Sequence, residues 1–79
     1  MKYVYILQSI AAPDHYYAGL TSDLRERLKR HNGGEVSHTS KFVPWRVKTY
    51  VAFSNDQQAI DFERYLKSAS GRAFAKKRL

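Results

Sequence analysis

The chain has no cysteine, only two prolines and no long hydrophobic run among its 79 residues. Without cysteine, neither a disulfide framework nor a thiolate metal site can stabilise the fold, so a packed core must do so. No stretch approaches the roughly 18 apolar residues of a membrane span, and the first ten residues lack the pattern of a signal peptide. With no repeat, linker or low-complexity segment either, we expect a single soluble, cytoplasmic domain over residues 1–79.

Acidic residues are scarce relative to basic ones. Seven Asp and Glu oppose 14 Lys and Arg, which gives a formal net charge of +7. So strong a bias in a short chain favours a polyanionic partner, which can be DNA, RNA or an acidic membrane surface. Of these we expect nucleic acid and no membrane partner. A basic surface without any nucleic-acid role is the alternative. An aromatic share of 14%, with six tyrosines, supplies enough apolar bulk to exclude a disordered chain.

Three segments have strand character. Residues 2–8 are apolar on both alternating faces, which is typical of a central strand covered on two sides. A turn over residues 9–14 joins them to a second strand over residues 15–20, and Tyr5 and Tyr17 should lie roughly opposite each other. Residues 45–53 alternate in the pattern of a half-buried strand, with the odd-numbered residues on one face.

Helices are expected between and after these strands. Thr21 or Ser22 would cap a first helix that runs to about Asn32, before two glycines. Residues 35–43 are polar and aperiodic, so we expect a surface loop. Ser54 or Asn55 would cap a second helix that ends near residue 69, and residues 72–79 form a short basic helix or tail. The sequence thus predicts an α+β fold of order β-β-α-β-α-α, with a three-stranded antiparallel sheet flanked by helices.

Two helical positions bear chemistry beside apolar neighbours. Glu63 lies at the edge of the apolar stripe of the second helix, so it needs either a salt bridge, to Lys67 at i+4 or to an arginine, or a role as a metal ligand. Arg27 and His31 share a face of the first helix by i,i+4 spacing. That face can hold a phosphate, or Arg27 can pair with a carboxylate while His31 favours the helix C-terminus.

The strands offer two tyrosines and a glycine. Tyr5 and Tyr17 are compatible with ordinary sheet aromatics. Gly19 lies inside the second strand, where glycine weakens a strand and often marks the close approach of a ligand or another backbone.

Taken together, these residues form a pattern. Val4-Tyr5-Ile6, then Tyr17-Ala18-Gly19, then Arg27 and a later helical Glu63 resemble the motifs of the GIY-YIG nuclease superfamily. The resemblance extends over nearly the whole chain and is greatest to the small stand-alone bacterial members. Val4 replaces the first glycine of the first motif and Ala18 the isoleucine of the second, both at packing positions. No asparagine follows Asn55, although some relatives carry one after the glutamate.

The resemblance implies a reaction and its participants. A DNA phosphodiester would be hydrolysed with one Mg²⁺ or Mn²⁺ held by Glu63, and Tyr5 would act as general base or as the attacking group. Tyr17 would orient the phosphate or nucleophile, Arg27 would neutralise developing charge, and His31 would shuttle a proton or contact phosphate. Nearby positive charge from Arg27 and the metal would help Tyr5 to ionise.

Binding would be weak, salt-sensitive and largely independent of sequence, because no base-reading module accompanies the domain. The expected contacts to nucleic acid are Gly19, Lys29, Arg30, Lys41, Arg46, Lys67 and Arg72. Two alternatives remain open, a binding module of the same fold that does not cleave and a small basic interaction protein. A protein partner or a homodimer is compatible with each of the three.

Overall fold

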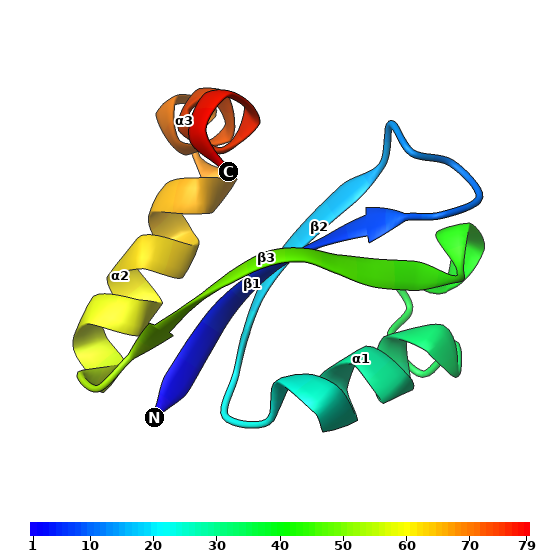
Figure 1. Ribbon diagram of the computed structural model, residues 1–79, viewed down its shortest axis with the longest axis horizontal. Helices are drawn as coiled ribbons and strands as arrows, with labels where there is room; N and C mark the ends of the chain where they lie inside the picture. The colour runs from blue at the N-terminus through cyan, green and yellow to red at the C-terminus, as the bar shows by residue number, and fades with distance from the viewer.

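The computed structural model describes residues 1–79 and shows the expected α+β fold. Three antiparallel strands, β1 (Lys2–Ser9), β2 (Tyr16–Thr21) and β3 (Trp45–Phe53), form a sheet of order β2-β1-β3. Helices α1 (Leu24–Asn32) and α2 (Asp56–Lys67) lie on opposite sides of the sheet, and α3 (Ala69–Arg78) follows α2 (Figure 1). A 3-10 turn, η1 (Ser40–Phe42), precedes β3. No helix is long and apolar enough to cross a membrane.

The core has two layers, one on each face of β1. Val4 and Ile6 pack with Ala59 and Leu66 of α2 on one face. Tyr5 and Leu7 pack with Trp45 on the other face, together with the partly buried apolar residues of α1. All four strand residues are 7% exposed or less, as the two-sided apolar pattern of the sequence predicts.

Strand β3 departs from the predicted alternation. Its pairing with β1 shifts register between Ile6 and Leu7, because Val47 pairs with Leu7 whereas Thr49 pairs with Ile6. The extra residue reverses the facing of the strand beyond it. Val47 therefore packs on the α1 side and Phe53 on the α2 side, so the prediction that the odd-numbered residues share one face is wrong.

The helix boundaries also differ in detail. The N-cap of α1 is Asp23, whose side chain accepts from Glu26 N at 3.1 Å, and not Thr21 or Ser22. Asn55 caps α2, as predicted. That helix ends at Lys67, and Ser68 caps α3 by accepting from Gly71 N.

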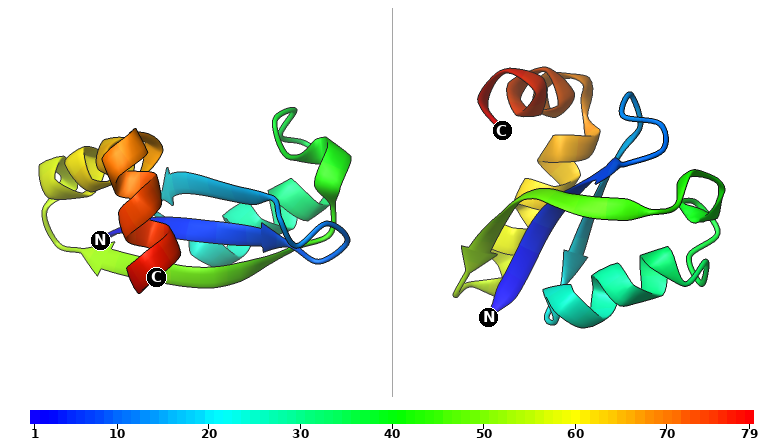
Figure 2. Two further views of the ribbon diagram at one scale, coloured as in Figure 1. Left: turned by 90° about the horizontal axis from the view of Figure 1, so that it is seen from above. Right: turned by 45° about the vertical axis from the view of Figure 1, so that its right-hand side comes forward.

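Gly71 follows the expected end of the second helix and lies in the first turn of α3. A Cβ at this position would collide with the carbonyl group of Tyr65. The glycine therefore lets α3 pack tightly against the end of α2, which it crosses in Figure 2. Arg72 and Lys76 of α3 line one pocket with residues at the start of β2.

Candidate active site

A buried hydrogen-bonded cluster surrounds the hydroxyl of Tyr5. The Tyr5 side chain projects from β1 and is 1% exposed. Its Oη lies 2.9 Å from His31 Nε2 and 3.4 Å from Arg27 Nε. Because Arg27 and His31 are one helical turn apart on α1, both reach the same phenol. Three residues that the sequence singled out thus meet at one oxygen.

Gly19 makes room for this cluster. It pairs with Tyr5 across the sheet, and a Cβ at this position would collide with the Tyr5 hydroxyl. We predicted that Gly19 would allow nucleic acid to approach the backbone. Instead Gly19 is buried and its open side is filled by Tyr5, so the close approach is that of a neighbouring side chain.

Thr39 determines which nitrogen of His31 carries the proton. Thr39 Oγ1 donates to Val36 O at 3.2 Å and lies 2.8 Å from His31 Nδ1. Since the single hydroxyl proton is directed to Val36, Thr39 accepts from a protonated Nδ1. In the neutral ring Nε2 is then free of a proton and accepts from the Tyr5 hydroxyl. The expected surface loop over residues 35–43 therefore contains a buried residue, because Thr39 is 1% exposed.

Burial and charge oppose each other at Tyr5. Desolvation raises the pKa of Tyr5 above its ordinary value, and the hydrogen bond and positive charge of Arg27 offset only part of this increase. Burial, and secondarily the charge of Arg27, lowers the pKa of His31. Arg27 does favour the ionised phenol, as predicted, but burial outweighs it. The resting pair is therefore a neutral phenol and a neutral imidazole.

Tyr17 forms the half-exposed side of the cluster. Its ring centroid lies 6.4 Å from that of Tyr5 and 5.1 Å from that of His31. We predicted that Tyr17 would lie opposite Tyr5, but the register places it opposite Leu7. The two tyrosines are therefore diagonal neighbours on one face, which still allows ring contact.

Glu63 is joined to the cluster through a lysine. Its Oε2 lies 2.9 Å from Lys67 Nζ, one turn later on α2, and Lys67 Nζ lies 5.6 Å from the Tyr17 ring centroid. The Glu63 hydrogen bond raises the pKa of Lys67. This ion pair is one of the two roles that the sequence allows for Glu63, and the other is that of a metal ligand. The Glu63 side chain is 18% exposed and that of Lys67 is 49% exposed.

Comparison with known proteins identifies the family of this arrangement. The sequence profile of the GIY-YIG catalytic domain matches residues 1–78. The chain belongs to the GIY-YIG family. In the solution NMR structure of the UPF0213 protein from Bacillus halodurans the fold recurs with a TM-score of 0.57 and 31% identity, over 96% of this chain and 81% of that one.

The sequence relatives of this GIY-YIG domain include two groups of proteins. UPF0213 proteins are 30% identical over 66 residues in Lacticaseibacillus paracasei and 34% over 68 in Clostridium perfringens, covering 82% and 85% of this chain and 72% and 71% of those proteins. The structure-specific endonuclease subunit SLX1 of Scheffersomyces stipitis is 39% identical over 67 residues, 76% of this chain. The chain spans about a fifth of the length of that protein. These relatives support a nuclease-type domain.

The GIY-YIG site offers a divalent metal ion one carboxylate, that of Glu63. No group of three or more His, Cys, Asp or Glu side chains could hold an ion by itself. Mg²⁺ is often bound by one or two carboxylates, with waters and substrate phosphates as its other ligands. Glu63 can supply such a carboxylate once Lys67 releases it, and the half-exposed Lys67 side chain has room to turn away.

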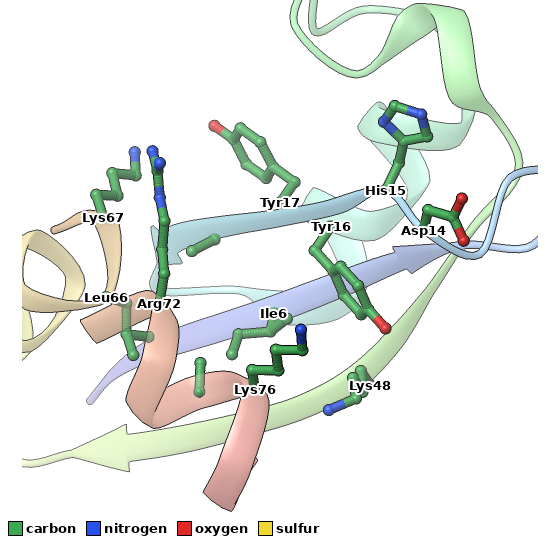
Figure 3. A pocket seen from close by; sticks show the side chains of 12 residues that line it. Ile6, Asp14, His15, Tyr16, Tyr17, Lys48, Leu66, Lys67, Arg72 and Lys76 are labelled. Carbon is green, nitrogen blue, oxygen red and sulfur yellow. The ribbon is translucent and has the colours of Figure 1, made fainter. Parts of the chain in front are cut away.

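The expected nucleic-acid contacts do not share one surface. Lys29 and Arg30 are exposed on α1, where Arg30 pairs with Glu26 at 3.2 Å. Lys41 is exposed in η1, and Arg46 on β3 donates to Gln8. In contrast, Lys67 and Arg72 line one pocket that also reaches Tyr17 (Figure 3).

Sequence reasoning missed two residues near these groups, Thr39 and Tyr16. Thr39 gave no signal, because an aperiodic polar segment does not reveal which side chain turns inward. Tyr16, Lys48 and Lys76 line the pocket with Lys67 and Arg72. Adjacent residues of a strand point to opposite faces, so the pair Tyr16-Tyr17 already implied an aromatic side chain on each side of β2.

Proposed function

We propose that this GIY-YIG domain is a metal-dependent endonuclease that hydrolyses phosphodiester bonds in DNA with low sequence specificity. The observation that carries the proposal is the position of the Tyr5 hydroxyl between the Nε2 acceptor of His31 and the Nε donor of Arg27. A buried phenol with one proton acceptor and one cationic donor is arranged to lose its proton and hold the resulting charge.

Tyr5 acts as the general base in this proposal. It passes its hydroxyl proton to His31 Nε2, and the Arg27 hydrogen bond stabilises the phenolate, which then takes a proton from the attacking water. The raised pKa of Tyr5 and the lowered pKa of His31 both oppose this proton transfer in the resting site. A bound phosphate offsets the charge of Arg27, which favours the His31 cation and so couples proton transfer to substrate binding.

Glu63 and Tyr17 act on the phosphate. Glu63 would hold Mg²⁺ or Mn²⁺, which when bound neutralises charge on the phosphate and leaving oxygens. Tyr17 is half-exposed and next to His31, so its hydroxyl can hydrogen-bond a phosphate oxygen. Arg27 remains beside Tyr5 and neutralises charge that develops in the transition state.

Low specificity follows from the kind of contact that is available. The exposed cations of the domain, including Lys29, Lys41 and Arg46, can reach phosphates and need not read bases. Affinity that depends on such contacts falls steeply with salt concentration.

One observation favours a second candidate, a nucleic-acid-binding module that does not cleave. The Glu63 carboxylate is already neutralised by Lys67 in this structure. A domain in which that pair persisted on nucleic acid would bind phosphates without turnover.

A pair of glutamate variants separates these candidates. Glu63→Gln and Glu26→Gln each remove one i,i+4 carboxylate–cation pair, and Glu26 lies on the exposed side of α1. Incubated with single-stranded, duplex and branched DNA and Mg²⁺ or Mn²⁺, the wild type and Glu26→Gln should cleave, whereas Glu63→Gln should be slower by at least about 100-fold. Equal cleavage by both variants refutes the nuclease site, and binding without cleavage by the wild type establishes the second candidate.

A further inference from the structure

A pocket on the α2 side of the sheet has features that the proposed reaction does not use. It encloses about 720 Å³, within the range of about 300–1,000 Å³ that is usual for small-molecule sites. Its apolar lining comes from both sheet and helices and consists of Ile6, Ala18, Leu66 and Ala75. Ile6 of the lining faces α2, whereas Tyr5 packs on the α1 face of the sheet. Tyr16 and Tyr17 leave β2 in opposite directions (Figure 3).

The charges around this pocket are nearly all positive. Four cations line it, namely Lys48, Lys67, Arg72 and Lys76, against the single carboxylate of Asp14. Of these cations only Lys67 is in an ion pair, and that pair is with Glu63, outside the pocket lining. Like charges around one concave surface repel one another unless an anion lies between them. Their arrangement from two sides, Lys48 on β3 and the others on α2 and α3, suits a ligand with more than one negative group.

The aromatic side of the pocket suits a planar ligand. Tyr16 is 54% exposed, although its ring is a large apolar surface, and Lys48 Nζ lies 5.8 Å from the ring centroid. A nucleobase stacks on such a ring whatever its sequence identity, and a neighbouring cation reaches the phosphate of the same nucleotide. The apolar lining would accept the rest of the base.

We propose that this pocket binds one unstacked nucleotide of the strand that the active site cleaves, with the base on Tyr16 and the flanking phosphates on Arg72 and Lys76. Tyr17 and Lys67 connect the two sites, because both line the pocket and Tyr17 also contacts His31. A strand held in the pocket therefore passes over the edge strand β2 to reach Tyr5. The identity of the ligand as the cleaved strand rests on the proposed function, whereas its chemistry, a base with flanking phosphates, rests on the pocket alone.

The test measures binding in the absence of divalent metal, so turnover plays no part. Fluorescence anisotropy would compare a labelled short oligothymidylate with an abasic oligomer of the same length and charge. Tyr16→Ala should bind the oligothymidylate about tenfold more weakly and the abasic oligomer unchanged, since stacking is worth about 1–3 kcal/mol per base. Tyr50→Ala is the matched control, because Tyr50 is also 54% exposed but lies away from the pocket lining. Tyr16→Phe should retain wild-type binding.

A charge variant tests the proposed phosphate contacts and should not affect folding, because Lys76 is exposed. Lys76→Gln should reduce the slope of log K against log salt by about 0.7 for either oligomer, as expected for one lost phosphate contact on a single strand. Lys77→Gln removes the same charge from the same helix outside the pocket lining and should leave the slope nearer to that of the wild type.

Three results would overturn the proposal that this pocket binds a nucleotide. They are an equal effect of Tyr16→Ala on both oligomers, an effect of Tyr50→Ala as large as that of Tyr16→Ala, and equal slopes for Lys76→Gln and Lys77→Gln. Thymidine 3′,5′-bisphosphate that competes as tightly as the strand would show a free-nucleotide site instead and overturn the strand as occupant. Cleavage by the wild type together with any of these results refutes the pocket and leaves the proposed nuclease intact. Base-dependent binding without cleavage refutes the proposed nuclease and leaves the nucleotide pocket intact.

Discussion

Replacing Thr39 with valine tests the hydrogen bonds behind Tyr5 with almost no change in side-chain shape. Thr39 is 1% exposed, and its hydroxyl joins His31 Nδ1 to the carbonyl of Val36. In Thr39→Val the protonated Nδ1 of His31, a residue that is 0% exposed, loses its acceptor. The ring is then no longer held in the tautomer that accepts a proton from Tyr5.

The expected loss of stability follows from the burial of both groups. A buried donor left without a partner costs about 1–3 kcal/mol. In a domain of this size each kcal/mol lowers Tm by about 4–8 °C, so Thr39→Val should melt at least about 4 °C below the wild type. Thermal unfolding followed by circular dichroism measures the change.

The expected loss of activity has a separate cause. The His31 cation formed during proton transfer donates from Nδ1 to Thr39, so losing this hydrogen bond should lower kcat by about tenfold. KM should not change, since Thr39 contacts the Nδ1 side of His31, and the reacting Tyr5 hydroxyl contacts the Nε2 side. Nitrogen NMR of His31 should show a neutral ring protonated at Nδ1 in the wild type and a mixture of tautomers in Thr39→Val.

A matched substitution controls for the loss of a hydroxyl. Thr49 is half-buried on β3, and its side chain makes no hydrogen bond, so Thr49→Val should change neither Tm nor kcat appreciably. Thr39→Ser, which retains the hydroxyl, should recover most of the kcat. Wild-type kcat and stability in Thr39→Val, or a proton on Nε2 of His31 in the wild type, would refute the proposed direction of proton transfer.

Two further changes probe the same cluster. Folding lowers the pKa of His31, so the unfolded chain binds more protons between the folded pKa and the ordinary value of about 6.5, and the stability present above that value is lost as the pH falls through this window. Urea titrations at pH 7.5 and 5.5 should show this loss in the wild type and also in His15→Asn and His38→Asn, which remove the other two histidines. An unchanged free energy of unfolding would contradict the assignment to His31. Gly19→Ala should displace Tyr5 and lower the free energy of unfolding by about 1–3 kcal/mol. Gly33→Ala is the control and should have a smaller effect, because Gly33 has φ −81° and a Cβ there would have its nearest contact at 3.3 Å. Equal denaturation midpoints for the two variants would contradict the packing role of Gly19.

The central strand and the first helix could be predicted because their signals are local. The apolar pattern of residues 2–8 reflects burial on both faces of β1, and the i,i+4 spacing of Arg27 and His31 follows from helical geometry alone. The sequence therefore predicted which side chains share a face.

Features that depend on contacts between distant segments could not be predicted. The register shift of β3 depends on its pairing with β1 and reverses the facing of Phe53. The break at Ser68 depends on the packing of Gly71 against Tyr65. Thr39 becomes buried only because its loop folds over His31. The ion pair of Glu63 with Lys67 was predictable as one of two alternatives, since i,i+4 spacing permits it but does not determine what a substrate would displace.

Single-turnover cleavage by Tyr5→Phe, beside Tyr3→Phe, tests the central claim most directly. Both residues lie on β1, and each variant loses one hydroxyl, but only that of Tyr5 contacts His31 and Arg27. With Mn²⁺ and a labelled oligonucleotide, Tyr5→Phe should cleave at least about 100-fold more slowly than the wild type, and Tyr3→Phe should match the wild type. Undiminished cleavage by a folded Tyr5→Phe protein would show that the Tyr5 hydroxyl is not the group that activates the nucleophile.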